Sequence, residues 1–229
     1  MAKLKKQVLG KVSGAVGDIV FRNRYENNYI SLRPIRFNTP MDDRAIARRD
    51  RFKSAIQLAS AMNSIIPIKQ LWNKLTSGNN TVYNRMVKYE YSALVNQLPS
   101  ENSGLFPGRG FALTVQTIEL NQNQLRIVTD AIGTDSGIDT QTEKTLRLVS
   151  VIALSSPANS VYPGVVYLPL ISASQNLVLT DPVDITVTFN PAEKELITVY
   201  NQKRILAGLI TFNIELQPVS FSDTLYQLQ

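Results

Sequence analysis

The chain has 229 residues, with 24 Lys and Arg, 18 Asp and Glu, no Cys, no His and a formal net charge of +6. The absence of Cys and His excludes disulfide frameworks, thiolate zinc sites, His-containing metal sites and the usual serine triad. An enzyme would have to work with carboxylates, lysine or tyrosine alone, so we expect a protein that is not an enzyme and binds no cofactor.

The charge is unevenly divided along the chain. Residues 1–110 hold 18 Lys and Arg against 7 Asp and Glu, a net charge of +11, whereas residues 111–229 hold 6 against 11, a net charge of −5. This division favours head-to-tail contact between copies, or a basic face for nucleic acid or an acidic neighbour. A solvated surface without any partner is the alternative.

Neither an export signal nor a membrane span is expected. Lys11 and Asp18 interrupt the apolar stretch that a signal peptide would need after its basic start. No run of eighteen apolar residues occurs anywhere in the chain. We therefore expect synthesis in the cytoplasm and no contact with a membrane.

Residues 1–36 predict an arm that leads into a β-hairpin. The glycines of the arm, Gly10, Gly14 and Gly17, have neither the spacing of a P-loop nor that of a dinucleotide fingerprint, so a phosphate cradle is excluded. What remains is a strand or arm loosened by glycine.

The hairpin itself is predicted by two runs of β-branched and aromatic residues, Ile19–Tyr25 and Tyr29–Arg33. They flank the turn residues Glu26, Asn27 and Asn28. Two strands alone are marginally stable in water. We therefore expect the hairpin to dock on the helices that follow or on a neighbouring subunit.

Residues 37–98 predict a helical region. The first helix begins at Thr39 and Pro40, which suit an N-cap and a first turn, and it ends before Pro67. It has an apolar stripe at spacings of three and four, and arginines on another face. A short helix over 68–75 and a third over 81–98 follow, and the third is expected to bury Val82, Met86, Tyr89 and Leu94.

Residues 99–110 contain Ser, Asn, two Pro and three Gly and are interpreted as a linker at a domain boundary. From 111 to 229 short alternating strands recur every eight to twelve residues or so, which is typical of a β-sandwich. The expected strands are Ala112–Leu120, Gln124–Thr129, Thr145–Ser155, Val165–Leu170, Asn176–Leu179, Asp184–Phe189, Glu195–Tyr200 and Leu206–Leu216. The predicted fold class is α+β, with an N-terminal hairpin arm and helices followed by an all-β, Ig-like sandwich.

Two acidic stretches in the second half of the chain are candidates for a calcium site and for a pair of catalytic carboxylates. The loop Asp130–Thr142 is rich in Asp, Gly and Thr, but it lacks EF-hand spacing, so a plain polar loop is favoured over a calcium site. Glu193 and Glu195 could supply paired carboxylates, but their context favours exposure to solvent. No metal site is therefore assigned.

A resemblance joins the features of the first 75 residues. Gly10–Val20, Tyr29-Ile30 with Arg33-Pro34, Asn38-Thr39-Pro40 and the Arg-rich Arg48–Phe52 resemble the N-terminal region of an uncharacterised family. This family is spread through Bacteroidota genomes and their phages, and similar openings occur in virion proteins of crAss-like phages. The resemblance covers about a third of the chain and implies a virion structural protein.

The expected function is therefore assembly. The leading hypothesis is a ring-forming portal or tail connector component that binds copies of itself and other virion proteins and is located in the virion, or in the host cytoplasm during assembly. A capsid decoration or head-fibre protein is one alternative, and a non-specific nucleic-acid-binding protein that uses the basic half is another. The candidate partner-binding residues are Lys5, Lys6, Arg22, Arg24, Tyr25, Tyr29, Arg33, Arg44, Arg48, Arg49 and Arg51.

Overall fold

The computed structural model describes residues 2–3, 13–24, 27–33, 40–74 and 80–229. The chain divides into two compact units, Met1–Ile46 and Ala47–Gln229. The described residues form four helices and three antiparallel sheets, so the fold class is α+β as expected. None of the described helices is long and apolar enough to cross a membrane.

The first unit contains a four-stranded sheet in the order β1-β4-β3-β2. Its strands are β1 (Ala2–Lys3), β2 (Gly14–Val16), β3 (Ile19–Arg24) and β4 (Asn27–Leu32). The predicted hairpin is confirmed, with pairs running from Ile19–Leu32 to Arg24–Asn27. Gly17, with a φ of +56°, allows the tight β2–β3 turn.

Three helices follow: α1 (Asp43–Ser64), α2 (Ile66–Lys74) and α3 (Val82–Ala93). Pro67 lies in the first turn of α2, where its missing N–H costs no hydrogen bond. Thr81 caps α3 by accepting a hydrogen bond from the Asn84 backbone N–H at 3.2 Å. The predicted cap at Thr39 lies outside the described residues.

The burial expected for α3 is wrong at one position. Tyr89 is 41% exposed, and Val87 and Glu90 are buried instead. The Tyr89 ring packs edge-on against the buried Trp72, with ring centroids 5.8 Å apart. Tyr89 therefore lies between the core and the solvent.

The larger sheet has the order β12-β11-β7-β8, with β13 paired to β11 and β9 to β7. Its strands are β7 (Glu143–Pro157), β8 (Val165–Ile171), β9 (Gln175–Asn176), β11 (Tyr200–Asn213), β12 (Pro218–Phe221) and β13 (Leu225–Leu228). The smaller sheet, ordered β10-β6-β5, comprises β5 (Val115–Leu120), β6 (Gln124–Ala131) and β10 (Pro182–Thr188). The sequence did not indicate β12 and β13, which fold back onto β11.

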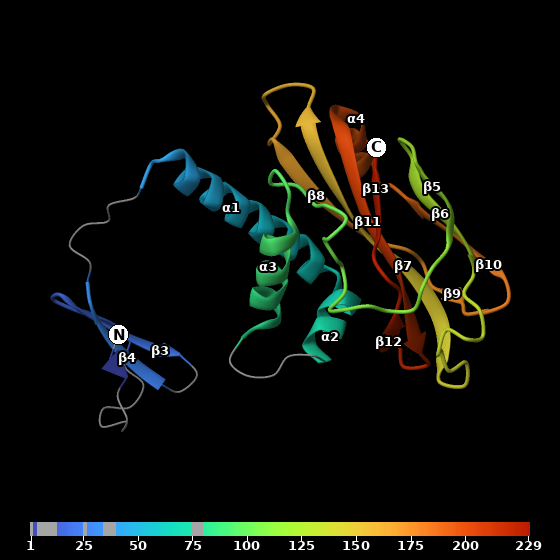
Figure 1. The fold of residues 1–229 in the computed structure, drawn as a ribbon, viewed down its shortest axis with the longest axis horizontal. Coiled ribbons are helices and arrows are strands. Elements are labelled where there is room, and N and C mark those ends of the chain that lie inside the picture. The colour runs from blue at the N-terminus through green and yellow to red at the C-terminus, as the bar shows by residue number, and fades with distance from the viewer. Residues whose placement is uncertain (1, 4–12, 25–26, 34–39, 75–79) are drawn as a thin grey trace. The chain divides into compact units, whose positions relative to one another are not determined.

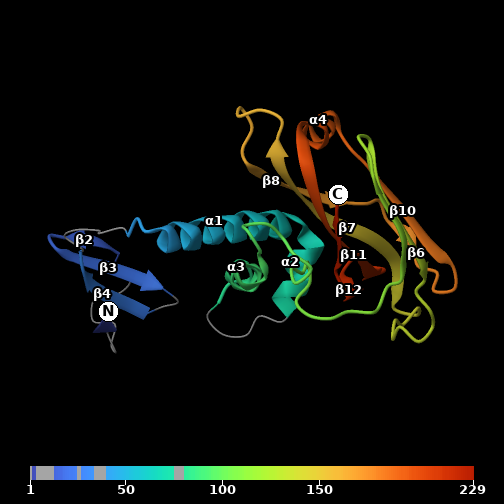
Figure 2. The same ribbon diagram turned by 45° about the horizontal axis from the view of Figure 1, so that its top comes forward.

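The second unit has three layers, with helices α1–α3 on one face of the larger sheet and the smaller sheet on the other (Figures 1 and 2). Successive side chains of β7 point to opposite faces of the larger sheet and so contribute to both cores. Leu148 and Ile152 belong to the core shared with the smaller sheet, whereas Val149 and Val151 belong to the core shared with the helices. The Ig-like form of the sandwich is not confirmed.

The segment 99–110, expected to be a linker, is tied into the second unit. Arg204 Nη1 donates to the Pro99 carbonyl at 2.7 Å, and Trp72 Nε1 donates to the Leu105 carbonyl at 2.9 Å. Phe106 is 1% exposed and stacks on Phe221 with centroids 5.0 Å apart. The division between the compact units falls after Ile46, and 99–110 joins the helices to the larger sheet.

The strand predicted over Glu195–Tyr200 is wrong, because residues 195–199 belong to helix α4 (Pro191–Val199) and β11 begins at Tyr200. Asn190 and Glu193 form a reciprocal capping box, and Pro191 occupies the first turn. These local interactions stabilise a helix start ahead of the apolar residues that suggested a strand.

In the loop predicted as polar over 130–142, the Asp130 carboxylate accepts a hydrogen bond from Gln116, and that of Asp139 accepts from its own loop. Asp139 accepts hydrogen bonds from the Gln141 backbone N–H at 2.9 Å and from Thr142 Oγ1 at 3.1 Å. Buried Glu143 accepts from Thr211 and, at 3.2 Å, from Ser220. Among the described residues, no group of three or more acidic side chains is placed to hold a metal ion.

Candidate functional site

One face of the N-terminal sheet gathers apolar side chains. Val16, Ile19 and Leu32 are successive cross-strand partners, so they form one row across β2, β3 and β4. Their exposed fractions are 72%, 41% and 75%. Phe21 and Ile30 pair in the next row of the same face. We call these five residues the N-terminal apolar face.

The end of this face near the β3–β4 turn is polar. Asn23 Nδ2 donates to Asn28 Oδ1 at 2.8 Å, and Asn28 is 4% exposed. The most exposed apolar row therefore lies at the opposite end, next to the β2–β3 turn.

The other face of the sheet carries several of the predicted partner-binding residues. Arg22 and Tyr29 are direct cross-strand partners, with Arg22 exposed and Tyr29 half-buried. Arg33, just after β4, is exposed as well. Lys5, Lys6 and Tyr25 lie outside the described residues, as does the side chain of Arg24.

The arginines of α1 do not form one uniform face. Arg44, Arg48 and Arg49 are exposed. Arg51 instead donates from Nη2 to the carbonyls of Ser92 and Leu94, at 3.1 and 2.9 Å, and lies over the ring of Tyr91. Arg51 therefore holds the C-terminal end of α3 against α1, a role that its place in the sequence did not reveal.

This difference gives a prediction within one helix. Arg51→Ala is expected to lower the free energy of unfolding by about 1–3 kcal/mol, because two carbonyls lose a charged donor. Arg48→Ala is the matched control and should change it by less than about 0.5 kcal/mol, because Arg48 is exposed. Chemical denaturation of both variants measures the difference, and equal stability of the two would show that the Arg51 contacts contribute nothing.

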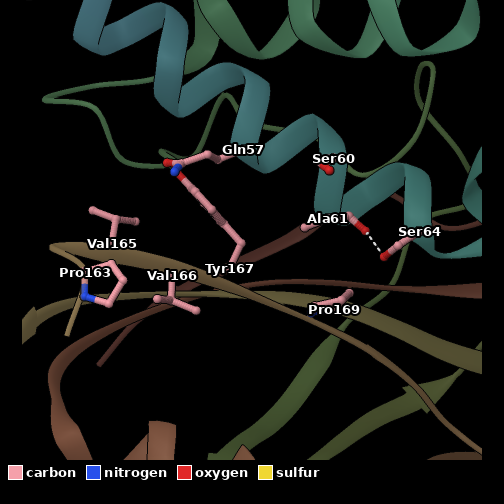
Figure 3. Close-up of a pocket in the computed structure, with 9 residues that line it drawn as sticks. All are labelled: Gln57, Ser60, Ala61, Ser64, Pro163, Val165, Val166, Tyr167 and Pro169. Carbon is pink, nitrogen blue, oxygen red and sulfur yellow. Dashed lines mark hydrogen bonds between the residues drawn. The ribbon is translucent and has the colours of Figure 1, made fainter.

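A pocket of about 440 Å³ lies between α1 and β8 (Figure 3). Gln57 and Ser60 come from α1, and Val166, Tyr167 and Pro169 come from β8. The Tyr167 side chain reaches from β8 toward Gln57. Tyr167 is the one ionisable side chain in this lining.

The second unit also buries a carboxyl group that the sequence did not single out. Glu90 is 0% exposed, and its Oε1 accepts from the Gly104 backbone N–H at 3.1 Å, whereas Oε2 is buried without a partner in the described part of the chain. Burial raises the pKa of this carboxyl to about 7, against the lowering effect of the Gly104 backbone N–H and of the Ser103 side chain. Burial, with the charge of Glu90, also raises the pKa of the Tyr167 hydroxyl.

One signal in the sequence could have indicated that Glu90 is buried. Glu90 follows Met86 by four residues and Val87 by three, so it falls on the apolar stripe of α3. An acidic residue on a buried stripe is unusual unless its charge is compensated. Its hydrogen bond to the 99–110 segment makes Glu90 a structural contact.

Comparison with protein-family models, curated proteins and solved structures gave no match for this chain. The candidate functional site is therefore chosen on geometry. Among the surfaces described, the N-terminal apolar face presents the most exposed row of apolar side chains that one sheet holds together.

Proposed function

We propose that this protein is a structural protein of a phage particle that forms a ring with copies of itself at the portal or tail. In this proposal the N-terminal apolar face of one copy docks on a neighbouring copy. The exposed row Val16, Ile19 and Leu32 is the observation that carries it. The resemblance of residues 10–52 to virion proteins supports a role in a phage particle.

The energetics of the N-terminal sheet support a partner. An exposed row of apolar side chains on a regular sheet is typical of a surface that another protein covers. Fully burying one Val, Leu or Ile side chain contributes about 1.5–3 kcal/mol, so covering this row would contribute several kcal/mol to association. A solvated row would offer no such gain.

The edges of the same sheet also favour assembly. Among the described strands, β2 lies at one edge of the sheet, because it pairs with β3 and its three residues are exposed. Exposed edges of this kind pair with strands of other chains. A neighbour that covers the apolar face can therefore also extend the sheet.

The experiment places charge in the exposed row. The double variant Val16→Glu, Leu32→Glu is expected to abolish assembly, because two carboxylates would have to be buried without partners. Ala15→Glu is the matched control, since Ala15 is exposed on β2 but faces the other side of the sheet. Light scattering coupled to size-exclusion chromatography measures the assembly, and circular dichroism checks folding.

Retention of normal assembly by the double variant would contradict the proposal. The exposed Arg44, Arg48 and Arg49 favour a second candidate, non-specific binding of nucleic acid. That candidate would be supported if DNA retention weakens steeply with salt and if assembly is unaffected by substitutions in the apolar row.

A further inference from the structure

A second cavity, of about 500 Å³, opens at the junction of α2, β7, β8 and β11. Its lining includes three exposed apolar side chains: Ile66 at 67%, Ile171 at 40% and Leu216 at 56%. These residues come from three separate parts of the chain, so the fold gathers them around one opening. An apolar opening of this kind is typical of a surface that receives a side chain from a partner.

Arg147 of β7 supplies a positive charge in this cavity. Its guanidinium carbon lies 5.2 Å from the centroid of the Phe212 ring, an arrangement that orients the group by cation–π attraction. Its Nε is buried without a hydrogen-bond partner, and within the described part of the chain no carboxylate pairs with it. A cation in an apolar cavity without a counter-ion favours a ligand that brings negative charge.

The turn between β11 and β12 presents a negatively charged side chain, Glu215, beside the same cavity. Ile214 is 84% exposed and Glu215 is exposed, while the next residue, Leu216, lines the cavity. The carboxylate of Glu215 has no partner within the described residues. One short tip therefore offers an apolar side chain followed by a carboxylate.

The tip has a fixed shape. Asn213 Oδ1 accepts from the backbone N–H groups of Glu215 and Gln217, at 3.0 and 2.8 Å. Leu216 has a φ of +58°, a left-handed conformation that a leucine adopts only where its surroundings enforce it. Because the tip is ordered before it binds, little conformational entropy opposes its docking.

We propose that the Ile214-Glu215 tip of one copy enters the Arg147 cavity of a second copy. Glu215 then pairs with Arg147, and Ile214 contacts the apolar opening. Since tip and cavity adjoin at Leu216, a two-fold axis close to this residue brings each tip onto the other copy's cavity, as in an isologous dimer. The contact belongs to the second unit and does not rest on the N-terminal apolar face.

Charge reversal tests this contact in the full-length chain. The background is Val16→Glu, Leu32→Glu, so that association through the N-terminal face is removed. Arg147→Glu and Glu215→Arg are each expected to weaken self-association at least tenfold, as measured by sedimentation velocity. Lys88→Glu and Glu101→Arg are the matched controls, since both residues are exposed and neither lines the cavity.

Mixing gives the sharper result. Arg147→Glu protein mixed with Glu215→Arg protein is expected to form mixed dimers, because each contact again joins one Arg and one Glu. Recovery in the mixture also shows that both variants are folded. A background protein that stays monomeric up to millimolar concentration, or a mixture that fails to recover association, would overturn the proposal.

Discussion

Replacing Phe106 by alanine is expected to lower the free energy of unfolding by about 3–5 kcal/mol. Phe106 is 1% exposed and stacks on Phe221 of β12. Its ring also lies over Gly208 of β11, where an added Cβ would come within 2.4 Å of Phe106 Cε2. Because glycine has no side chain to fill the vacated space, the cavity left by the variant would persist.

Denaturation followed by the fluorescence of Trp72 measures this effect. Trp72 is the only tryptophan in the chain, and it donates a hydrogen bond to the carbonyl of Leu105, next to Phe106. Phe52→Ala is the control: Phe52 is 51% exposed and packs edge-on against Tyr91, so its loss should cost about 1 kcal/mol. Equal costs for the two variants would mean that the 99–110 segment is only loosely attached.

The second large effect is a dependence of stability on pH that arises from Glu90. The pKa of its carboxyl rises from 4.5 to about 7 on folding. Between these values the folded protein binds more protons than the unfolded chain, so stability is expected to fall as the pH rises from about 4.5 to 7 and then to level off. The ionised carboxyl costs the folded state on the order of 3 kcal/mol at pH 8.

Glu90→Gln should remove most of this dependence and stabilise the protein at pH 8. The amide oxygen can still accept the hydrogen bond from the Gly104 backbone N–H, while the charge is gone. Glu101→Gln is the matched control, since Glu101 is exposed. Urea denaturation between pH 4.5 and 8 measures both, and a wild-type profile that the Gln variant reproduces would rule out Glu90 as the titrating group.

Local patterns predicted the elements better than they predicted what packs together. The hairpin at Ile19–Leu32 and the start of the third helix near Thr81 depend on neighbours in sequence, so local turn and helix signals could indicate them. The capping box at Asn190 was equally local, and it outweighed the strand pattern of the residues after it.

The role of 99–110 could not be inferred in the same way, because it depends on distant partners. Composition suggested a linker, whereas Leu105 and Phe106 belong to the core that the helices share with the larger sheet. Their hydrogen-bond and stacking partners, Thr224 and Phe221, lie more than a hundred residues away. Contacts at such separation leave no periodic signal in one sequence.

The candidate sites could not be predicted for the same reason, because they depend on contacts between residues that are far apart in the sequence. The exposed row Val16, Ile19 and Leu32 becomes visible only once strand register is known. Arg51 could not be distinguished from Arg48 by spacing, because its acceptors are at the end of α3.

The position of β11 has a consequence for biosynthesis. Leu206, Ile210 and Phe212 of this strand complete the core beneath the helices, although those helices end at residue 93. During synthesis from the N-terminus, this core therefore stays incomplete until more than a hundred residues beyond the end of α3 have been made. A nascent chain with that much unsatisfied surface is prone to aggregation. We expect the yield of native protein to depend on how fast translation passes from α3 to β11, and on chaperones that shield the helices meanwhile.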